Sequence, residues 1–295
     1  MNENDIVHVP VLLDETIRLL DPKPDEDYVD GTVGQGGHSE AILRKTAPKG
    51  RVLAIDRDPR NLETARRRLS AFGDRVSYFR GSFAEADKAA GENGFVGPVS
   101  GVLLDIGFSS AHISDASRGF SFAPGPLDMR YDTSQALTAA TIVNEWEEED
   151  IARILRVWGE EPNARKIAKA IVQARRAEPI AATDQLADIS SALIPRRGKI
   201  HPATRTFQAL RIAVNDELGE LERALPKLVG MLKPGGRLAV ISFHSLEDRI
   251  VKKFFKQEDS KTVRLITKKV VVPTEEEVRR NPRARSAKLR VVERL

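Results

Sequence analysis

The glycine-rich segment Asp30-Gly-Thr-Val-Gly-Gln-Gly-Gly-His38 carries the strongest chemical signal in the 295-residue chain. Glycines in a loop allow tight turns and let a ligand approach the backbone closely. A helix that begins after such a loop offers free N–H groups to a carboxylate or a phosphate. The spacing does not match G-x-G-x-x-G, which weakens a dinucleotide interpretation. For this loop alone, a nucleotide-type site and a purely structural turn both stay open.

Two aspartates end later apolar segments and could complete a site with this loop. Asp56 ends the segment 51–56, twenty residues after Gly36, where a carboxylate can accept hydrogen bonds from ribose hydroxyls. Asp105 ends the segment 101–105, and open α/β sheets bind ligands beyond the carboxyl ends of their strands. Alone, Asp56 could also be a surface carboxylate, and Asp105 could also be a buried helix cap. Together with the loop they predict a site for an adenosine ribose.

The elements that must position these residues alternate between strand and helix patterns, which predicts a parallel, doubly wound α/β sheet. A Pro-Gly-Gly turn at 233–236 leads into one of the strands. The expected strands are 27–30, 51–56, 76–79, 101–105, 237–243, 263–266 and 287–292, and the expected helices are 11–20, 39–45, 61–69, 206–232 and 246–255.

The alternation of strand and helix patterns stops in the middle of the chain. Residues 109–130 are rich in Ser, Gly, Pro and Asp and predict an irregular loop. Residues 136–194 then show only helical patterns, over 144–157, 164–176 and 183–193, with Thr183 as a capping residue of the last helix. We therefore expect an inserted helical domain. The expected boundaries are 1–112 and 205–295 for the two parts of the sheet domain and 113–204 for the insertion.

Composition excludes several classes of site and location. The chain has no Cys, so disulfides and thiolate metal sites are excluded. Its five His show no metal-ligand spacing, and we expect no metal. Neither a secretory signal nor an apolar run of about 20 residues is present, so the expected location is the cytoplasm.

Charge is nearly balanced overall but uneven along the chain. The net charge is +4, yet residues 279–290 hold six basic side chains and no acidic one. Such a cluster predicts either a phosphate-binding surface or a solvated surface strand. Glu247 and Asp248 stand at an expected helix start, where acids favour the helix dipole, and this structural interpretation can suffice for them.

Taken in order along the whole chain, these segments resemble the bacterial 16S ribosomal RNA (cytosine-N4)-methyltransferase family, RsmH or MraW. The likeness is specific because several matching strings are long and are not general to methyltransferases. The matching stretches are 8–13, 30–39, 54–58, 104–107 with 109–110, 118–122, 125–130, 159–161, 201–208, 241–249 and 281–287.

The resemblance implies a Rossmann-like class I methyltransferase sheet with an inserted all-α substrate-recognition domain. It also implies methyl transfer from S-adenosyl-L-methionine to N4 of one cytidine in the decoding region (P site) of 16S rRNA. The family usually has Gln at position 112, an Asp in the loop 122–125, and a longer segment after Phe255. By matching position, the cofactor contacts would be Gly36, Gly37, His38, Asp56, Phe83, Asp105 and His112.

The exocyclic amine of cytosine is a poor nucleophile, because it shares its lone pair with the ring. An enzyme can help by accepting hydrogen bonds from the amine and removing its spare proton. Many amino-methyltransferases use Asp/Asn-Pro-Pro-aromatic after strand four, whereas this chain has Asp105-Ile-Gly-Phe-Ser-Ser110. We therefore expect carbonyls near Gly107 and the hydroxyls of Ser109 and Ser110 to accept from the amine, with Asp105 beside them.

The target base must leave its stack to reach such a pocket. Phe120, Phe122, Arg130 and Arg205 are the candidates to hold it, with core packing as the alternative for the two phenylalanines. From the basic cluster, Arg283 and Arg285 are expected to bind RNA phosphates.

Three other functions compete with this one. A nicotinamide dehydrogenase could use the same loop and Asp56, but the chain lacks a clean dinucleotide motif. An amino-methyltransferase acting on DNA or another RNA is the nearest alternative, and a non-catalytic RNA-binding protein would not need Asp56. The expected partner is 16S rRNA in the small ribosomal subunit, and the sequence leaves the oligomeric state open, a homodimer included.

Overall fold

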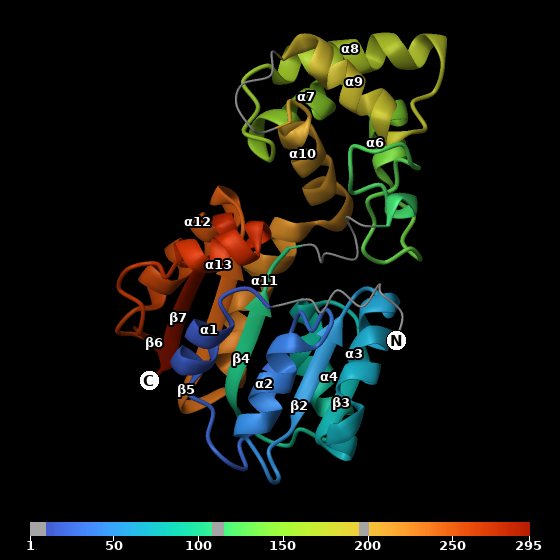
Figure 1. Cartoon of the computed structure of the whole chain (residues 1–295). Helices are drawn as coiled ribbons and strands as arrows, with labels where there is room; N and C mark the ends of the chain where they lie inside the picture. Colours follow the sequence, from blue (N-terminus) through green and yellow to red (C-terminus); the bar gives the residue numbers. More distant parts are fainter. Residues whose placement is uncertain (1–9, 108–114, 195–200) are drawn as a thin grey trace. The chain divides into compact units, whose positions relative to one another are not determined.

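The computed structural model describes residues 10–107, 115–194 and 201–295. The chain divides into two compact units (Figure 1). An α/β unit takes in the chain up to Gly107 and again from Leu218, and a helical unit spans Phe108–Glu217. An inserted helical domain is thus present. It ends at Glu217 rather than at 204, because Phe207 and Leu210 pack in its core.

A seven-stranded sheet with the order β3-β2-β1-β4-β5-β7-β6 forms the α/β unit. All predicted strands are present, but the sheet is not wholly parallel: β7 runs antiparallel to both β5 and β6. This is a Rossmann-like arrangement, as the resemblance implied. The strands are β1 (Tyr28–Asp30), β2 (Val52–Asp56), β3 (Val76–Arg80), β4 (Val99–Asp105), β5 (Leu232–Ser242), β6 (Val263–Leu265) and β7 (Lys288–Arg294).

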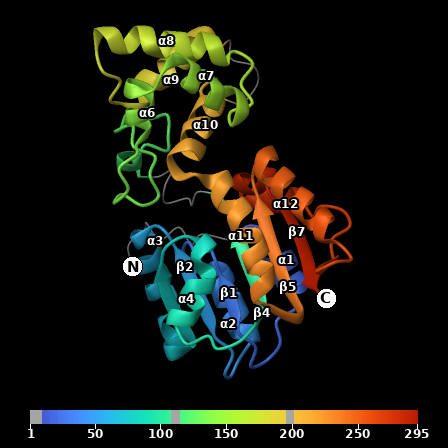
Figure 2. The same cartoon turned by 180° about the vertical axis from the view of Figure 1, so that it is seen from behind.

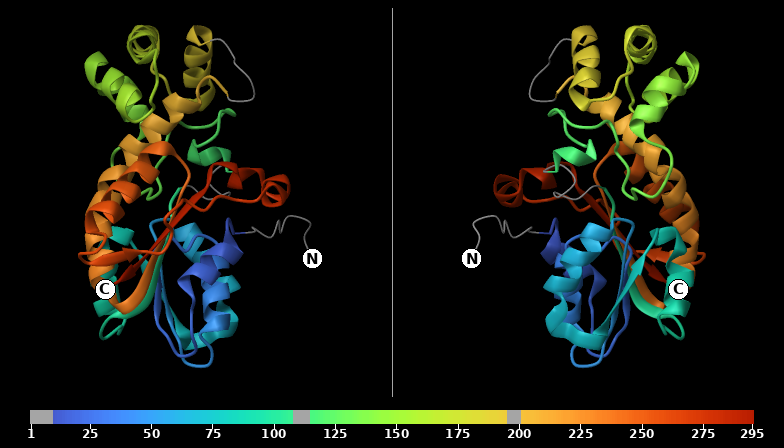
Figure 3. Two further views of the ribbon diagram at one scale, coloured as in Figure 1. Left: turned by 90° about the vertical axis from the view of Figure 1, so that its left-hand side faces the viewer. Right: turned by 90° about the vertical axis from the view of Figure 1, so that its right-hand side faces the viewer.

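Helices cover both faces of this sheet because its strands are apolar on both sides (Figures 2 and 3). In β2, for example, Leu53 and Ile55 enter one core while Val52 and Ala54 enter the other. The first core is closed by α4 (Ala86–Glu92), α11 (Glu217–Met231) and α12 (Ser245–Glu258), and the second by α1 (Leu13–Leu20), α2 (Gly37–Lys45) and α3 (Pro59–Arg68).

The reversed strand β7 brings a late segment of the chain to the carboxyl edge of the sheet. Lys288, at the beginning of β7, pairs with Ser242, at the end of β5. The two short elements before β7, α13 (Glu275–Arg280) and η4 (Pro282–Ser286), therefore lie at the edge where β1, β2 and β4 end. Helix α13 was not predicted from the sequence.

The middle of the chain forms helices, as the sequence predicted. Two helices that were predicted to be continuous are each interrupted. The helix expected over 144–157 is interrupted at Trp146, which is extended (ψ 154°). The helix expected over 206–232 is broken at Asp216, whose φ of 49° is left-handed. The α-helices of the helical unit within the described residues are α6 (Ala139–Glu145), α7 (Glu148–Val157), α8 (Ala164–Ala177), α9 (Thr183–Leu193) and α10 (Thr204–Asn215).

Two turn predictions are modified by the structure. Thr183 does not cap α9; its hydroxyl donates to the Ala123 carbonyl (2.6 Å), and the Gln185 side chain accepts the backbone N–H groups before the helix. The Pro-Gly-Gly turn is an excursion within β5, since Leu232 and Arg237 pair with Val99 and Gly101. Among the described helices, none is long and apolar enough to cross a membrane.

Candidate active site

The glycine loop begins at Asp30, whose buried carboxylate folds the loop back on itself. Asp30 Oδ2 accepts from the Ser39 hydroxyl (2.6 Å), and Oδ1 accepts from the Thr32 backbone N–H (3.2 Å). Burial raises the pKa of Asp30 to about 6, and the charge of Asp56 adds to that rise. The conformation of the loop therefore depends on the Asp30 carboxylate, although burial of this group destabilises its charged form.

Two glycines of the loop are required by backbone conformation or by contact. Gly36 precedes α2 with φ 82°, a left-handed conformation that other residues rarely adopt. At Gly37, a Cβ would lie 2.2 Å from Pro10 Cγ. Any larger side chain at Gly37 would thus displace the N-terminus of α2. A helix N-terminus can bind an anion.

Asp56 is bound to the same loop. Its Oδ2 accepts from the Gly34 N–H (3.0 Å) and from Asn61 Nδ2 (3.1 Å), and its Oδ1 accepts from the Asp58 N–H (2.9 Å). Asp58 in turn caps α3. The carboxylate therefore sits at the end of β2 against the glycine loop, in the position that the sequence predicted.

Asp105 and His38 face one another between the end of β4 and the start of α2. His38 Nε2 lies 3.1 Å from the Val11 carbonyl, so this nitrogen carries the proton and Nδ1 points to Asp105 Oδ2 at 3.7 Å. The Asp105 backbone N–H donates to the Thr32 hydroxyl (2.6 Å). Within the described part of the chain, Asp105 Oδ1 is buried and has no hydrogen-bond partner. Such an atom marks a place where a ligand donor would fit.

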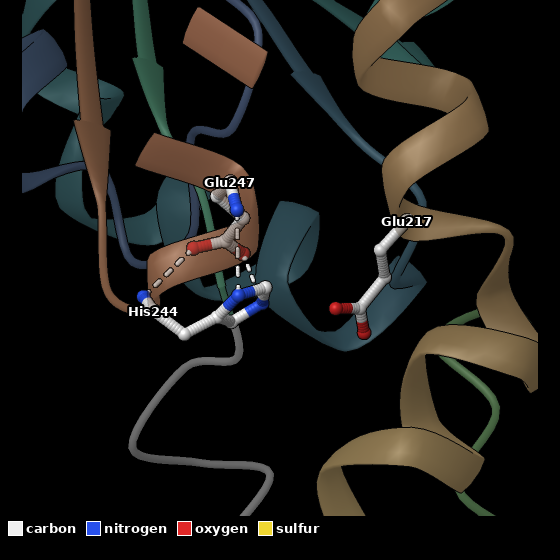
Figure 4. A group of neighbouring side chains, drawn as sticks. All are labelled: Glu217, His244 and Glu247. Carbon is white, nitrogen blue, oxygen red and sulfur yellow. Dashed lines mark hydrogen bonds and ion pairs between the residues drawn. The ribbon is translucent and has the colours of Figure 1, made fainter. Parts of the chain in front are cut away.

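Burial raises the pKa of Asp105 to about 8, and the negative charges of Asp30 and Glu247 contribute to the rise. Glu247 is buried at the start of α12, where Oε2 accepts from the N–H groups of Phe243 (2.9 Å) and His244 (3.2 Å). Figure 4 shows the His244 ring lying beside this carboxylate. The structural interpretation of Glu247 is thus confirmed, and the same side chain adds negative charge to the site.

Phe83 follows β3 and lies against the beginning of the glycine loop. A Cβ on Gly31 would lie 2.9 Å from Phe83 Cβ and 2.6 Å from Leu104 Cδ2. The structure therefore brings six of the predicted cofactor residues to one edge of the sheet. They are Gly36, Gly37, His38, Asp56, Phe83 and Asp105. Ser109, Ser110 and His112 lie outside the described residues.

The predicted base-holding residues lie in the helical unit and are engaged there in different ways. Phe120 is buried and stacks on Tyr131, with ring centroids 5.5 Å apart. Phe122 stacks on His201 at 4.2 Å. These contacts give both phenylalanines packing roles.

Two predicted arginines of the same unit differ in exposure. Arg130 forms an ion pair with Asp128 (2.7 Å), and its Nη1 donates to the carbonyls of Thr133 and Gln135. Arg205 is exposed on α10. Arg205 is therefore the better placed of the two to meet a ligand.

Three side chains of the basic cluster 279–290 form ion pairs. Arg290 and Lys288 pair with Asp248 (2.7 and 3.6 Å), and Arg280 pairs with Glu276. Arg283 and Arg285 are exposed on η4. These two keep the role of candidate phosphate ligands.

Sequence reasoning missed Thr32 and the electrostatic part of Glu247. Thr32 stands inside the glycine-rich loop, and its β-hydroxyl close to the loop glycines was an available signal. Glu247 was assigned only to its helix start, because its approach to Asp105 joins segments more than 100 residues apart.

Residues 5–295 match the model of the MraW methylase family. The chain belongs to the MraW methylase family. Ribosomal RNA small subunit methyltransferase H of Heliobacterium modesticaldum is 50% identical, with 98% of each chain covered. The protein of that name from Geobacter sulfurreducens is 49% identical, with 98% of this chain and 99% of the relative covered. As a member of this family, the chain is an S-adenosylmethionine-dependent methyltransferase.

Solved structures also align along the chain. A putative rRNA methylase from Clostridium thermocellum has 14% sequence identity and a TM-score of 0.49, and covers 98% of this chain and 100% of its own. A putative methyltransferase from Streptococcus mutans, in complex with SAH, has 12% identity and a TM-score of 0.49, with 98% and 100% covered.

Proposed function

We propose that this MraW-family chain methylates 16S rRNA at N4 of a cytidine in the decoding region, with S-adenosylmethionine as the methyl donor. The names of the relatives support ribosomal RNA of the small subunit as the substrate. The choice of N4 and of the decoding region (P site) rests on the resemblance of the matching strings. One structural observation carries the assignment of the donor site: the partnerless oxygen of Asp105, among the described residues, beside the glycine loop.

The charge of the site fits S-adenosylmethionine, which bears a sulfonium and an ammonium group. Asp30, Asp105 and Glu247 are close enough for the two other negative charges to raise the pKa of Asp105. A cationic ligand would relieve this repulsion, whereas the pyrophosphate of a dinucleotide would increase it. The same carboxylates thus disfavour a nicotinamide dehydrogenase.

Different residues at the carboxyl edge would bind different groups of S-adenosylmethionine. The start of α2 after Gly36 and Gly37 suits its carboxylate, and Asp56 suits the ribose hydroxyls. Phe83 offers an apolar surface for the adenine, and Asp105 suits a cationic or hydrogen-bond-donating group. When bound, the cofactor supplies an activated methyl electrophile.

The chain must then orient the cytosine amine and accept its spare proton. We propose that Ser109 and Ser110, which follow Asp105 in sequence, accept hydrogen bonds from the amine. Ser109→Ala and Ser110→Ala should keep the affinity for S-adenosylmethionine and lose turnover. Full activity in both variants would reject this assignment.

An in vitro methylation assay tests the function as a whole. Purified protein and labelled S-adenosylmethionine are incubated with small subunits from cells that lack the enzyme, with naked 16S rRNA, and with DNA. Nucleoside mass spectrometry should find N4-methylcytidine in the ribosomal RNA. Label in DNA alone, or a different methylated nucleoside, would favour the alternative of another amino-methyltransferase. A ribosomal substrate would also place the enzyme in the cytoplasm.

A further inference from the structure

The short turn that carries Phe83 is held from two directions. Phe83 begins η2 (Phe83–Glu85), which follows β3 after Gly81 and Ser82. On the strand side, the Gly81 N–H donates to the Asp56 carbonyl (3.1 Å). Because Phe83 meets the glycine loop at Gly31, its orientation depends on whatever fixes this turn.

Ser82 organises the turn from within. Its hydroxyl oxygen accepts from the Ala84 N–H (3.0 Å), while its own N–H donates to Glu85 Oε2 (3.2 Å). This reciprocal capping box satisfies two backbone donors at the beginning of η2. The single proton of the Ser82 hydroxyl is then available to a partner outside the turn.

Helix α11 supplies that partner and a second contact. The Ser82 hydroxyl donates to the carboxylate of Glu220. Two turns further along α11, the Lys227 ammonium donates to the Ala84 carbonyl (2.9 Å) and lies 3.5 Å from the Asp87 carboxylate. Side chains seven residues apart share one face of a helix, so α11 holds this turn at two points.

We propose that Glu220 and Ser82 form a positioning pair that orients Phe83 for the S-adenosyl group; this inference rests on the proposed function. The Ser82 side chain is buried and the Glu220 side chain is 18% exposed, which shields their hydrogen bond from water. By accepting the hydrogen bond from the Ser82 hydroxyl, Glu220 directs a lone pair of that oxygen at the Ala84 N–H. The pair thus sets the direction in which η2 leaves β3.

Calorimetric titration with S-adenosylmethionine and with S-adenosylhomocysteine tests the pair. Ser82→Ala and Glu220→Ala should each weaken binding by about 10-fold, as expected for one charge-assisted hydrogen bond. The double variant should bind no worse than either single variant, because the two act as a unit. Glu220→Gln keeps an acceptor and should recover most of the affinity. Glu222→Ala, at an exposed position of the same helix, is the matched control and should bind like the wild type.

Steady-state kinetics separates positioning from stability. In the pair variants, the KM for S-adenosylmethionine should rise about 10-fold, while kcat at saturating cofactor and the KM for RNA stay near wild type. A lowered Tm with unchanged cofactor affinity would overturn the inference in favour of a purely structural contact. Additive losses in the double variant would overturn it as well.

The wild type and Phe83→Ala distinguish this inference from the proposed function. If the wild type binds no S-adenosylmethionine, the proposed function fails and the role of the pair fails with it. If the wild type binds and Phe83→Ala weakens binding while the pair variants do not, only the positioning pair is rejected.

Discussion

Asp105 has one buried carboxylate oxygen that no described residue contacts by a hydrogen bond, and its pKa is raised to about 8. Burial is the main cause, and the charges of Asp30 and Glu247 add to it. His38 also faces the group through Nδ1, at 3.7 Å. The raised pKa favours the protonated carboxyl group in the free enzyme near neutral pH, whereas a cationic ligand favours its ionised form.

Cofactor affinity should consequently depend on pH. Between pH 6 and 7.5, the affinity for S-adenosylmethionine should rise by up to about tenfold per pH unit, because binding must release the Asp105 proton. Calorimetry in buffers of different ionisation enthalpy would detect that proton. Asp105→Asn cannot release it and serves as the control for titration of the ligand itself. An equal pH dependence in Asp105→Asn would contradict this linkage.

The same burial should lower the stability of the ligand-free enzyme. A carboxyl group whose pKa is higher in the folded state contributes stability below its unfolded pKa of about 4, and this contribution is lost as pH rises toward 8. Asp105→Asn should therefore raise the free energy of unfolding by on the order of 2 kcal/mol at pH 8 and change it little at pH 4. Urea unfolding at both pH values measures this. If Asp105→Asn were less stable than the wild type at pH 8, burial of the Asp105 carboxylate would not destabilise the fold.

At the scale of elements, the glycine loop and the Phe83 turn meet at Gly31. A Cβ at this position would overlap Leu104 Cδ2 and Phe83 Cβ, at 2.6 and 2.9 Å. Gly31→Ala should therefore displace the turn and weaken cofactor binding by about 10-fold or more, with a decrease of roughly 1–3 kcal/mol in the free energy of unfolding. Cofactor titration and thermal unfolding measure the two effects.

Gly91 provides the matched comparison. It lies in α4, is exposed, and a Cβ there would meet nothing within 4 Å. Gly91→Ala should leave cofactor binding unchanged and raise stability by about 0.5–1 kcal/mol, because alanine loses less backbone entropy in a helix. If both substitutions had the same effect, the close approach at Gly31 would not matter.

Most elements of the site could be predicted because their signals are local. Asp30, Asp56 and Asp105 each end an apolar segment, and parallel strands bring such ends to one edge. The break at Asp216 was missed because the apolar spacing of a helix continues on both sides of it, although Asn215, Asp216 and Gly219 are poor helix formers. The role of α11 in holding Ser82 was equally hidden, because Ser82 and Glu220 are 138 residues apart.

At the scale of the whole molecule, the chain folds into two units with separate cores. Within the α/β unit, the reversal of β7 places η4 at the same edge as the glycine loop. A hydrogen bond between α13 and the residue before α1 supports this placement, since the Leu12 N–H donates to Glu277 Oε1 (2.7 Å). Arg283 and Arg285 are thus exposed at the same edge of the sheet as the glycine loop.

Reversing these two charges should weaken RNA binding. In the variant with Arg283→Glu and Arg285→Glu, the slope of log K against log salt should become shallower by about 1 for each phosphate that the protein no longer binds. Cofactor affinity should not change. Binding to a 16S rRNA fragment at several salt concentrations gives the slope.

The control reverses two exposed lysines at the opposite edge of the sheet. Lys45 ends α2 and Lys49 follows it, just before the chain enters β2. Lys45→Glu with Lys49→Glu should leave both the RNA affinity and the slope near wild type. Equal losses of affinity in the two double variants would indicate a general effect of net charge rather than a phosphate site on η4.

The alternating strands and helices, the inserted helical domain, the glycine loop and the aspartates that end β2 and β4 could all be predicted from the order of residues alone. These features follow from periodicity and motifs within a few residues of one another. Three others depend on the folded chain: β7 is reversed, Glu247 raises the pKa of Asp105, and Glu220 meets Ser82. Each of these joins segments distant in the chain, and long-range pairing depends on how the elements pack rather than on any local pattern.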